Sequence, residues 1–210
     1  DNFDHSVEKI GACNTILPDN GKLIGYNSDY IGAIECLKKK TEIKGKHVLV
    51  LGAGGVSRAI IYGLLEEKAK ILVVNRTLKK AKVLSNEFGV DYGDIEDPKV
   101  YKNYDLIINA TSVGSRKTEE CSCHLCKYLG FNDMNNKCDE IFLENKIALD
   151  VVFQRNTTEF TKAAEKMGHN IVYGHEMLVS QGAFQFKLFT GHEAPRDIMY
   201  SELKSNLEDW

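Results

Sequence analysis

A glycine-rich turn between an apolar run and a helical pattern constrains this chain more than any other feature. Residues 48–51 read Val-Leu-Val-Leu, Gly52-Ala53-Gly54-Gly55 follows at once, and a helical pattern begins at Val56. In a strand–turn–helix unit, such glycines permit a tight turn and let the backbone approach a pyrophosphate, which the first N–H groups of the helix face. We therefore expect a dinucleotide-binding turn; the alternative is a closely packed turn that binds nothing.

The rest of the middle region repeats this alternation of strand and helix. Its apolar runs are short and lack polar alternation, which is typical of strands that are covered on both faces. Strands that alternate with helices predict a parallel, doubly wound sheet, so we expect an α/β fold of the Rossmann type. The expected strands are 48–51, 71–74, 106–108, 147–153 and 170–173, and the expected helices are 56–67, 78–88 and 157–167.

The two ends of the chain do not extend this pattern, and we expect them to form a second, smaller packing unit. The predicted division is residues 1–44, a Rossmann domain at 45–175 with a polar, irregular insertion at 115–146, and returning helices at 176–210. The flanking elements that we expect are extended segments at 11–17 and 22–26 around a turn at 18–21, and helices at 29–40, 175–189 and 195–207.

The second predicted strand ends at Asn75-Arg76-Thr77. An NAD-binding fold usually places an acidic residue about 20 positions after the glycines, where it binds the ribose 2′-hydroxyl. Arg76 stands there instead, and a guanidinium can stack on adenine and form paired hydrogen bonds with a 2′-phosphate. This favours NADP; the alternative is a solvated basic helix start.

The third strand is followed by Asn109-Ala110-Thr111-Ser112-Val113-Gly114. Ligands bind at the carboxyl ends of parallel strands in such sheets. We expect Thr111 and Val113 to lie near the nicotinamide ribose.

Composition excludes several classes of function. The 27 basic and 30 acidic residues give a net charge of −3, which argues against general binding to nucleic acid or to an anionic membrane. No apolar run approaches the roughly 20 residues that span a bilayer. The chain has no secretory leader pattern and opens without Met, so we expect a processed product or a piece of a longer protein.

Six cysteines in 210 residues suggest free thiols in a reducing compartment. Four of them lie in the insertion, and their spacing is tighter than the paired arms of a zinc ribbon. We expect free thiols there and no metal; zinc is the alternative. The four residues are Cys121, Cys123, Cys126 and Cys138.

Several segments, in this order, make the chain resemble shikimate dehydrogenases, including the version at the end of multifunctional shikimate-pathway proteins. They cover nearly the whole chain apart from the insertion. Besides the glycine turn, Asn75-Arg76-Thr77 and Asn109–Gly114, the matching segments are Ile10-Gly11-Ala12-Cys13-Asn14-Thr15, Gly25-Tyr26-Asn27-Ser28-Asp29, Asp150-Val151-Val152-Phe153 and Glu176-Met177-Leu178-Val179-Ser180-Gln181.

The resemblance implies NADPH-dependent reduction of 3-dehydroshikimate to shikimate, in aromatic amino-acid biosynthesis. It implies that Asn14, Asp29 and Gln181 bind the substrate and that Asp29, with a Lys partner, is catalytic. A reduced carbonyl needs a proton source at the new alkoxide, which agrees with this pairing. The implied NADP-binding residues are Gly52, Ala53, Gly54, Gly55, Val56, Asn75, Arg76, Thr77, Thr111, Val113, Val152, Gly174 and Met177.

The chain also departs from the family pattern. Phe153 stands where Tyr is usual, Arg155 where Pro is usual, and Ser28 where Thr is usual. The upstream Ser-x-Ser clamp and the segment with the catalytic Lys have no counterpart, since Lys9 and Lys22 lie in the wrong context. We therefore expect residues 1–44 to be a remnant of the substrate lobe and this chain alone to be weakly active or inactive.

Other interpretations remain open from the sequence. One is quinate dehydrogenase, which a preference for NAD would favour. Another is a non-catalytic NADP-binding module derived from the enzyme. We expect a small-molecule substrate, a cytoplasmic location (a plastid if a transit peptide lies upstream), and a dehydroquinate dehydratase domain as a fused or separate partner.

Overall fold

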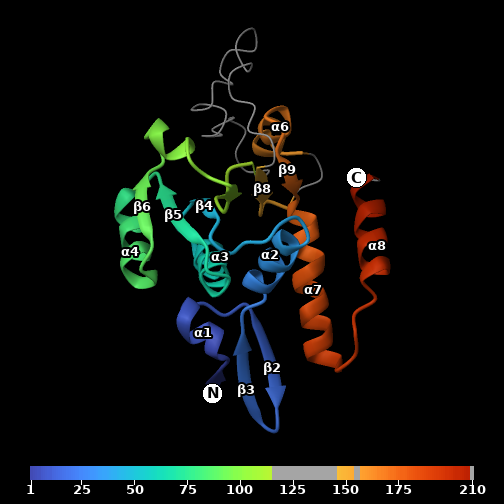
Figure 1. Cartoon of the computed structure of the whole chain (residues 1–210). Helices are drawn as coiled ribbons and strands as arrows, with labels where there is room; N and C mark the ends of the chain where they lie inside the picture. The colour runs from blue at the N-terminus through green and yellow to red at the C-terminus, as the bar shows by residue number, and fades with distance from the viewer. Residues whose placement is uncertain (115–145, 154–156, 209–210) are drawn as a thin grey trace.

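The computed structural model describes residues 1–114, 146–153 and 157–208, and a six-stranded parallel sheet lies at its centre (Figure 1). The strand order is β6-β5-β4-β7-β8-β9, and every neighbouring pair is parallel. This is the doubly wound order of a Rossmann fold, which confirms the predicted fold class. The strands are β4 (His47–Leu51), β5 (Lys70–Asn75), β6 (Asp91–Asp94), β7 (Leu106–Asn109), β8 (Ile147–Asp150) and β9 (Asn170–Val172).

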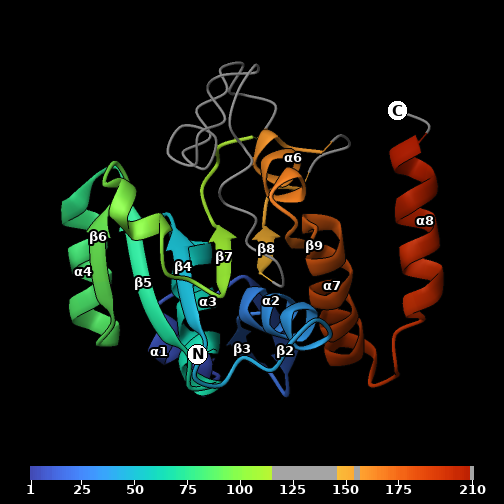
Figure 2. The same cartoon turned by 45° about the horizontal axis from the view of Figure 1, so that its top comes forward.

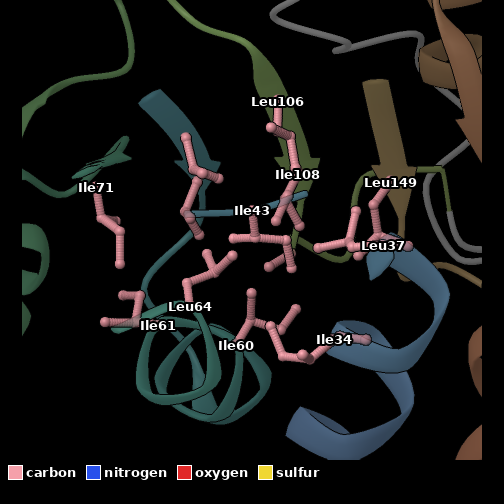
Figure 3. Close-up of a cluster of buried hydrophobic side chains, with 14 of the residues drawn as sticks. Ile34, Leu37, Ile43, Ile60, Ile61, Leu64, Ile71, Leu106, Ile108 and Leu149 are labelled. Carbon is pink, nitrogen blue, oxygen red and sulfur yellow. The ribbon is translucent and has the colours of Figure 1, made fainter. Parts of the chain in front are cut away.

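Helices cover both faces of this sheet, so successive residues of a central strand enter opposite cores. In β4, Val48 and Val50 pack in one core and Leu49 and Leu51 in the other. This burial on both faces explains why the strands are apolar without alternation. Figure 3 shows the first core, where the sheet meets α2 and α3. The covering helices are α3 (Gly55–Glu66), α4 (Leu78–Phe88), α6 (Glu159–Lys166) and the 3₁₀ turn η1 (Pro98–Tyr101).

The first 26 residues form a separate small sheet in the order β1-β3-β2. Its hairpin turns at Asn20 and Gly21, with φ of 47° and 78°, which suits a two-residue turn of type I′. Pro18 and Asp19 therefore belong to the strand, and the predicted turn at 18–21 was too wide. The elements are β1 (Asn2–Phe3), α1 (His5–Ile10), β2 (Thr15–Asp19) and β3 (Lys22–Tyr26).

Helix α2 (Asp29–Lys38) joins the two parts, because it packs on α3 and on α7 (Gly174–Thr190). Ile34 and Leu37 of α2 belong to the same core as the central sheet. A Cβ at Gly32 would lie 2.8 Å from the carbonyl oxygen of Met177, so glycine permits the close approach of α2 and α7. Helix α8 (Arg196–Glu208) lies outside α7 in both views (Figures 1 and 2).

Four elements, β1, α1, β6 and η1, were not predicted from the sequence, and the strand expected at 147–153 was too long. That strand ends at Asp150, because the N–H of Val152 donates to Asp150 Oδ1 at 3.1 Å and so turns away from the sheet. Within the described ranges, no helix combines the length and the apolar character that crossing a bilayer requires.

Candidate functional site

The glycine turn lies at the carboxyl end of β4, and its first residue, Gly52, packs closely against Ala110. Gly52 has a φ of +108°, and a Cβ there would lie 2.7 Å from the carbonyl oxygen of Ala110. Both the left-handed backbone and the close approach require glycine. Gly54 and Gly55 are exposed, and a Cβ at either would meet open space. The turn therefore presents bare backbone beside free space, which fits a pyrophosphate.

Helix α3 begins directly after this turn. Ser57 is fully buried, and its hydroxyl accepts a hydrogen bond from the N–H of Gly54 at 3.2 Å, so the start of the helix is fixed. The N–H groups of Gly55 and Val56 have no carbonyl partner within the helix, as in any first turn. Unpaired N–H groups at a helix start attract phosphate oxygens.

A basic segment follows the neighbouring strand β5. Arg76 is exposed and makes no hydrogen bond or ion pair with any residue that the structure describes. Asn75 donates from Nδ2 to the carbonyl oxygen of Thr77 at 3.1 Å, which fixes the turn on which Arg76 stands. Lys79 and Lys80 are also exposed. A guanidinium that has no partner among the described residues can donate hydrogen bonds to a phosphate ester here.

Beyond β7, the side chain of Asn109 fixes the course of the next segment. Its Oδ1 accepts from the N–H and the hydroxyl of Thr111, at 3.2 and 2.6 Å, and its Nδ2 donates to the carbonyl oxygen of Val113 at 3.3 Å. The Thr111 hydroxyl in turn accepts from the N–H of Val113 at 3.1 Å. Thr111 and Val113 therefore lie on one compact turn at the carboxyl edge of the sheet.

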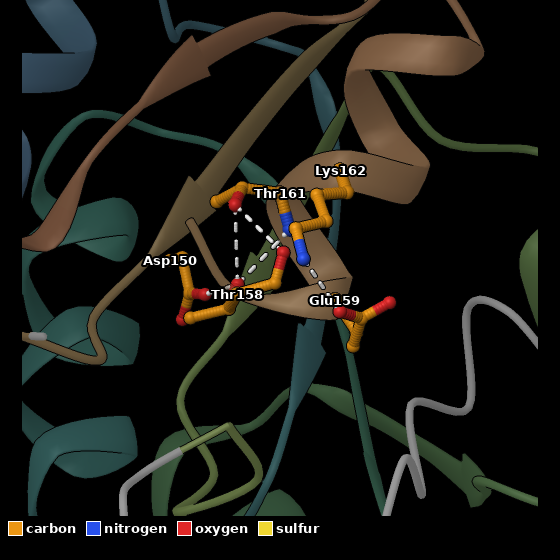
Figure 4. A network of polar contacts seen from close by, with 5 residues as sticks. All are labelled: Asp150, Thr158, Glu159, Thr161 and Lys162. Atoms are coloured by element: carbon orange, nitrogen blue, oxygen red, sulfur yellow. Dashed lines mark hydrogen bonds and ion pairs between the residues drawn. The ribbon is translucent and has the colours of Figure 1, made fainter. Parts of the chain in front are cut away.

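Asp150, at the end of β8, is 1% exposed and binds Asn109, whose Nδ2 donates to Asp150 Oδ1 at 2.9 Å. Its other oxygen accepts from the hydroxyl of Thr158, which caps α6 (Figure 4). Burial raises the pKa of Asp150 to about 6, although the hydrogen bonds from Thr158, Val152 and Asn109 oppose the shift.

The first turn of α7 packs against the segment that follows β8. A Cβ at Gly174 would lie 2.5 Å from the carbonyl oxygen of Val152, so only glycine permits this contact. Met177, one turn further along the helix, is 5% exposed. The structure thus brings Val152, Gly174 and the start of α7 together beside the ends of β7 and β8.

The residues that the family resemblance assigns to the substrate lie where β2, β3 and α2 meet. Asn14 accepts at Oδ1 from the N–H of Ser28 at 2.9 Å, and from the Thr15 hydroxyl at 2.9 Å. Burial raises the pKa of the Asp29 carboxyl, while a hydrogen bond with the Asn14 side chain opposes the shift. Asn14 and Asp29 are therefore neighbours, and Ser28 occupies the fully buried position between them.

Gln181 lies on α7 opposite α2, where a Cβ at Gly32 would come within 3.1 Å of Gln181 Cβ. Its Oε1 is buried and has no hydrogen-bond partner among the described residues. Buried polar atoms are nearly always paired, so an orphan oxygen indicates a missing donor such as a ligand hydroxyl.

Gln185, one helical turn after Gln181, was not predicted from the sequence. Its Nε2 donates to the hydroxyls of Thr15 and Ser28, at 2.9 and 3.1 Å. It therefore fixes the segments that carry Asn14 and Asp29. The spacing of four between the two glutamines was a usable signal, since it places both on one face of a helix.

Some expectations concern parts of the chain that lie outside the described residues. The cysteines at 121, 123, 126 and 138 and the position of Arg155 belong there. Phe153 is described and is 48% exposed. In the ranges that the structure covers, no group of three or more His, Cys, Asp or Glu residues is arranged to hold a metal ion.

Comparisons with known proteins agree with this geometry. The family model described as "Shikimate / quinate 5-dehydrogenase" matches residues 35–119, and "Shikimate 5'-dehydrogenase C-terminal domain" matches residues 174–204. A shikimate dehydrogenase (NADP(+)) of Nitrosopumilus maritimus is 36% identical over 211 residues, which cover 97% of this chain and 72% of that protein.

Solved structures give the same result. Shikimate 5-dehydrogenase of Thermus thermophilus, in complex with NADP(H) and shikimate, matches with a TM-score of 0.79 and 31% identity, over 99% of this chain and 72% of that one. A chorismate mutase/shikimate 5-dehydrogenase fusion protein of Clostridium acetobutylicum matches with a TM-score of 0.80 and 27% identity, over 100% of this chain and 72% of that one.

The doubly wound sheet and the open glycine turn at its carboxyl edge define a dinucleotide-binding protein of the Rossmann class. The similarity over nearly the whole chain then fixes the family: this chain belongs to the shikimate dehydrogenases.

Proposed function

We propose that this chain acts as an NADP-dependent shikimate dehydrogenase, which interconverts 3-dehydroshikimate and shikimate. The observation that carries the proposal is the open glycine turn at the end of β4, beside Arg76 at the end of the adjacent strand β5, which is exposed and has no partner among the described residues. Relatives that share this fold carry the same activity in their names, and one of them binds NADP(H) and shikimate.

The residues for the cofactor form three groups along the carboxyl edge of the sheet. The turn Gly52, Ala53, Gly54, Gly55 and Val56 binds the pyrophosphate through backbone N–H groups. Asn75, Arg76 and Thr77 bind the adenosine 2′-phosphate, where the guanidinium forms charged hydrogen bonds. When NADPH is bound, it supplies the hydride. The third group lies beside the nicotinamide ribose and ring: Thr111, Val113, Val152, Gly174 and Met177.

The substrate is assigned to Asn14, Asp29 and Gln181. The side-chain amides of Asn14 and Gln181 orient the hydroxyl groups of the substrate. Oε1 of Gln181 has no partner among the described residues and can accept a hydrogen bond from one of them. Asp29 is half-buried, and burial raises the pKa of its carboxyl. It therefore holds a proton more readily than an exposed carboxylate does and can relay one to the new alkoxide.

The proposal extends to organisation and setting. Residues 45–175, with the insertion at 115–146, form the cofactor domain, and residues 1–44 and 176–210 form a substrate lobe that α2 attaches to it. A reducing, cytoplasmic location suits the unpaired thiols of Cys13 and Cys36. We also propose a fused or separate dehydroquinate dehydratase as partner; the Clostridium relative, in which a shikimate dehydrogenase is fused to chorismate mutase, supports only fusion to a second enzyme.

The test combines binding and turnover on the full chain. Calorimetric titration should show that NADP⁺ binds more tightly than NAD⁺. Oxidation of shikimate and of quinate is then followed through the absorbance of the reduced cofactor. We expect shikimate with NADP⁺ to be the preferred pair, at the low rate that the sequence predicts for this chain alone, and Asp29→Asn to lower that rate by about 10²-fold, as loss of a proton-transfer group typically does.

Each other outcome contradicts the proposal in a defined way. Faster turnover of quinate with NAD⁺ would identify a quinate dehydrogenase. Tight binding of NADP⁺ without turnover of either substrate would identify a non-catalytic NADP-binding module. Binding of neither dinucleotide would contradict the assignment of the glycine turn itself.

A further inference from the structure

We propose that Asp150 is a positioning residue for the cofactor. Through one buried carboxylate, it sets the course of the two segments that face the nicotinamide half, residues 111–113 and 151–152. This inference rests on the proposed function, because it concerns the arrangement of that cofactor site.

The contacts of Asp150 reach both segments. Oδ1 accepts from the backbone N–H of Val152 at 3.1 Å and from Asn109 Nδ2 at 2.9 Å. Asn109 in turn binds the N–H and hydroxyl of Thr111 and the carbonyl oxygen of Val113. One oxygen atom of Asp150 is therefore the common anchor of two turns that leave neighbouring strands.

The same network determines how the Asn109 amide is oriented. An ionised carboxylate only accepts hydrogen bonds and the N–H of Thr111 only donates, so Nδ2 must point to Asp150 and Oδ1 to Thr111. The two strands place this pair in register, since Asn109 and Asp150 are Cα partners in the ladder of β7 and β8. A change at Asp150 is therefore transmitted to residues 111–113.

The second oxygen connects the anchor to helix α6. Oδ2 accepts from the hydroxyl of Thr158, which also accepts from the N–H of Thr161 at 3.0 Å (Figure 4). A Cβ at Gly114 would lie 3.2 Å from the Thr158 side chain, so the turn after β7 also rests on this cap. The carboxylate thus joins the ends of two strands and the start of a helix.

The cost of this arrangement supports a functional role. Asp150 is 1% exposed, and burial raises its pKa to about 6, so the ionised form is held against a desolvation penalty. A buried leucine would fill the same place without a charge, but it would offer no acceptor to Asn109 and Val152. Groups with such perturbed pKa values concentrate at functional sites, and this one adjoins the predicted nicotinamide contacts.

The experiment compares two ligands that share the adenosine half. NADP⁺ spans the whole proposed site, whereas 2′,5′-ADP lacks the nicotinamide and should contact only residues 52–56 and 75–77. Titrations are made with wild-type protein, Asp150→Ala and Asp150→Asn, and with Lys162→Ala as a matched control. Lys162 is exposed in the first turn of α6, where it pairs with Glu159 at 2.8 Å (Figure 4).

We expect Asp150→Ala to weaken NADP⁺ binding by about tenfold or more, since hydrogen bonds to a charged group are lost, while 2′,5′-ADP binding changes less than about twofold. Asp150→Asn keeps an acceptor oxygen for Asn109 and Val152 and should retain most of the NADP⁺ affinity. Lys162→Ala should leave both ligands unchanged.

Three results would overturn the positioning role. They are unchanged NADP⁺ affinity in Asp150→Ala, an equal loss for both ligands, and an Asp150→Asn variant as weak as Asp150→Ala. Wild-type protein that binds neither ligand would instead contradict the proposed function. If circular dichroism shows that Asp150→Ala is unfolded, Asn109→Ala cuts the same connection to residues 111–113. It should give the same selective loss, and equal losses for both ligands would again overturn the inference.

Discussion

The carboxyl and amino edges of the central sheet, where its parallel strands end and begin, each bury a polar pair, yet the pairs connect different segments. At the carboxyl edge, Asn109 and Asp150 hold the turns that leave the sheet. At the amino edge, the hydroxyl of Tyr104 meets Nε2 of His169 at 2.9 Å, just before β7 and β9 begin. The first pair organises the turns after β7 and β8, whereas the second joins the residues that lead into β7 and β9, on either side of β8. A buried polar pair alone therefore does not indicate a binding site. The Asn109–Asp150 pair does so because it is connected to the turns that we propose to face the cofactor.

Burial shifts the pKa values of Asp150 and His169, one from each pair, in opposite directions. Burial raises the pKa of Asp150 to about 6 and lowers the pKa of His169 to about 4, so each group is pushed toward its neutral form. Burial likewise raises the pKa of Tyr104, which keeps its hydroxyl protonated. At neutral pH the Tyr104–His169 pair is therefore uncharged, while the Asn109–Asp150 pair retains a carboxylate.

Glycines at the two ends of β4 give the largest expected contrast. Gly52→Ala should lower the free energy of unfolding by about 4 kcal/mol, because it adds a clash with Ala110 to a left-handed backbone. Gly45, at the amino edge, has a φ of +74° but open space around it, so Gly45→Ala should cost only about 1 kcal/mol. Urea unfolding measures both, and equal losses would contradict the close contact at Gly52.

The pH dependence of stability sharpens the comparison at Asp150. Its folded pKa, about 6, lies above the ordinary value of 3.8, so the folded state binds the proton more tightly and stability falls as pH rises from about 4 to 6. Asp150→Asn removes this loss. Relative to wild type, the variant should gain about 3 kcal/mol between pH 4 and pH 7, at about 1.4 kcal/mol per tenfold change in proton affinity. Parallel stability curves would contradict the burial of this charge.

His169 should give the reverse result in the same pH range. Its folded pKa, about 4, lies below the ordinary value of 6.5, so its contribution is complete above pH 6.5 and is lost as pH falls toward 4. His169→Gln should therefore gain up to about 3 kcal/mol relative to wild type on acidification. If the free energy of unfolding of His169→Gln instead fell further below that of wild type at low pH, His169 would bind a proton in the folded state.

Charge reversal on the two edges tests cofactor recognition. Arg76→Asp should weaken NADP⁺ binding by about 100-fold, or about 2.7 kcal/mol, since a charged hydrogen-bonding partner of the 2′-phosphate is lost, and should leave NAD⁺ nearly unaffected. Lys102→Asp changes another exposed cation, directly after η1 at the amino edge, and should change neither affinity. Calorimetry with both dinucleotides measures this, and equal effects of the two variants would indicate only a general charge attraction.

The sequence predicted best what depends on burial by both faces of the sheet. The central strands are apolar throughout, so their runs stood out, and the glycine turn stood out because it followed one of them. Strand β6 (Asp91–Asp94) was missed because it is an outermost strand of the sheet, is little buried and has no apolar run. Helix α1 was missed because it has only six residues, and a tertiary contact fixes its end: Arg58 donates from Nε to the carbonyl oxygen of Ile10 at 2.6 Å.

The residues of the proposed site could likewise be predicted only in part. Arg76 could be picked out because its position relative to the glycines has a known chemical meaning. The anchoring role of Asp150 could not, since its main partner, Asn109, is 41 positions away in the sequence and its burial depends on α6. Gln185 was missed for the same reason, because its partners Thr15 and Ser28 lie in the first 28 residues.

Amide hydrogen exchange with and without saturating NADP⁺ tests most directly the claim that the carboxyl edge of the sheet is the cofactor site. We predict slower exchange on binding for peptides that contain residues 52–58, 75–77, 109–113 and 150–152. We predict no change for residues 102–106 and 168–171, which border the Tyr104–His169 pair. Protection confined to the amino edge, or spread evenly over both edges, would contradict the account.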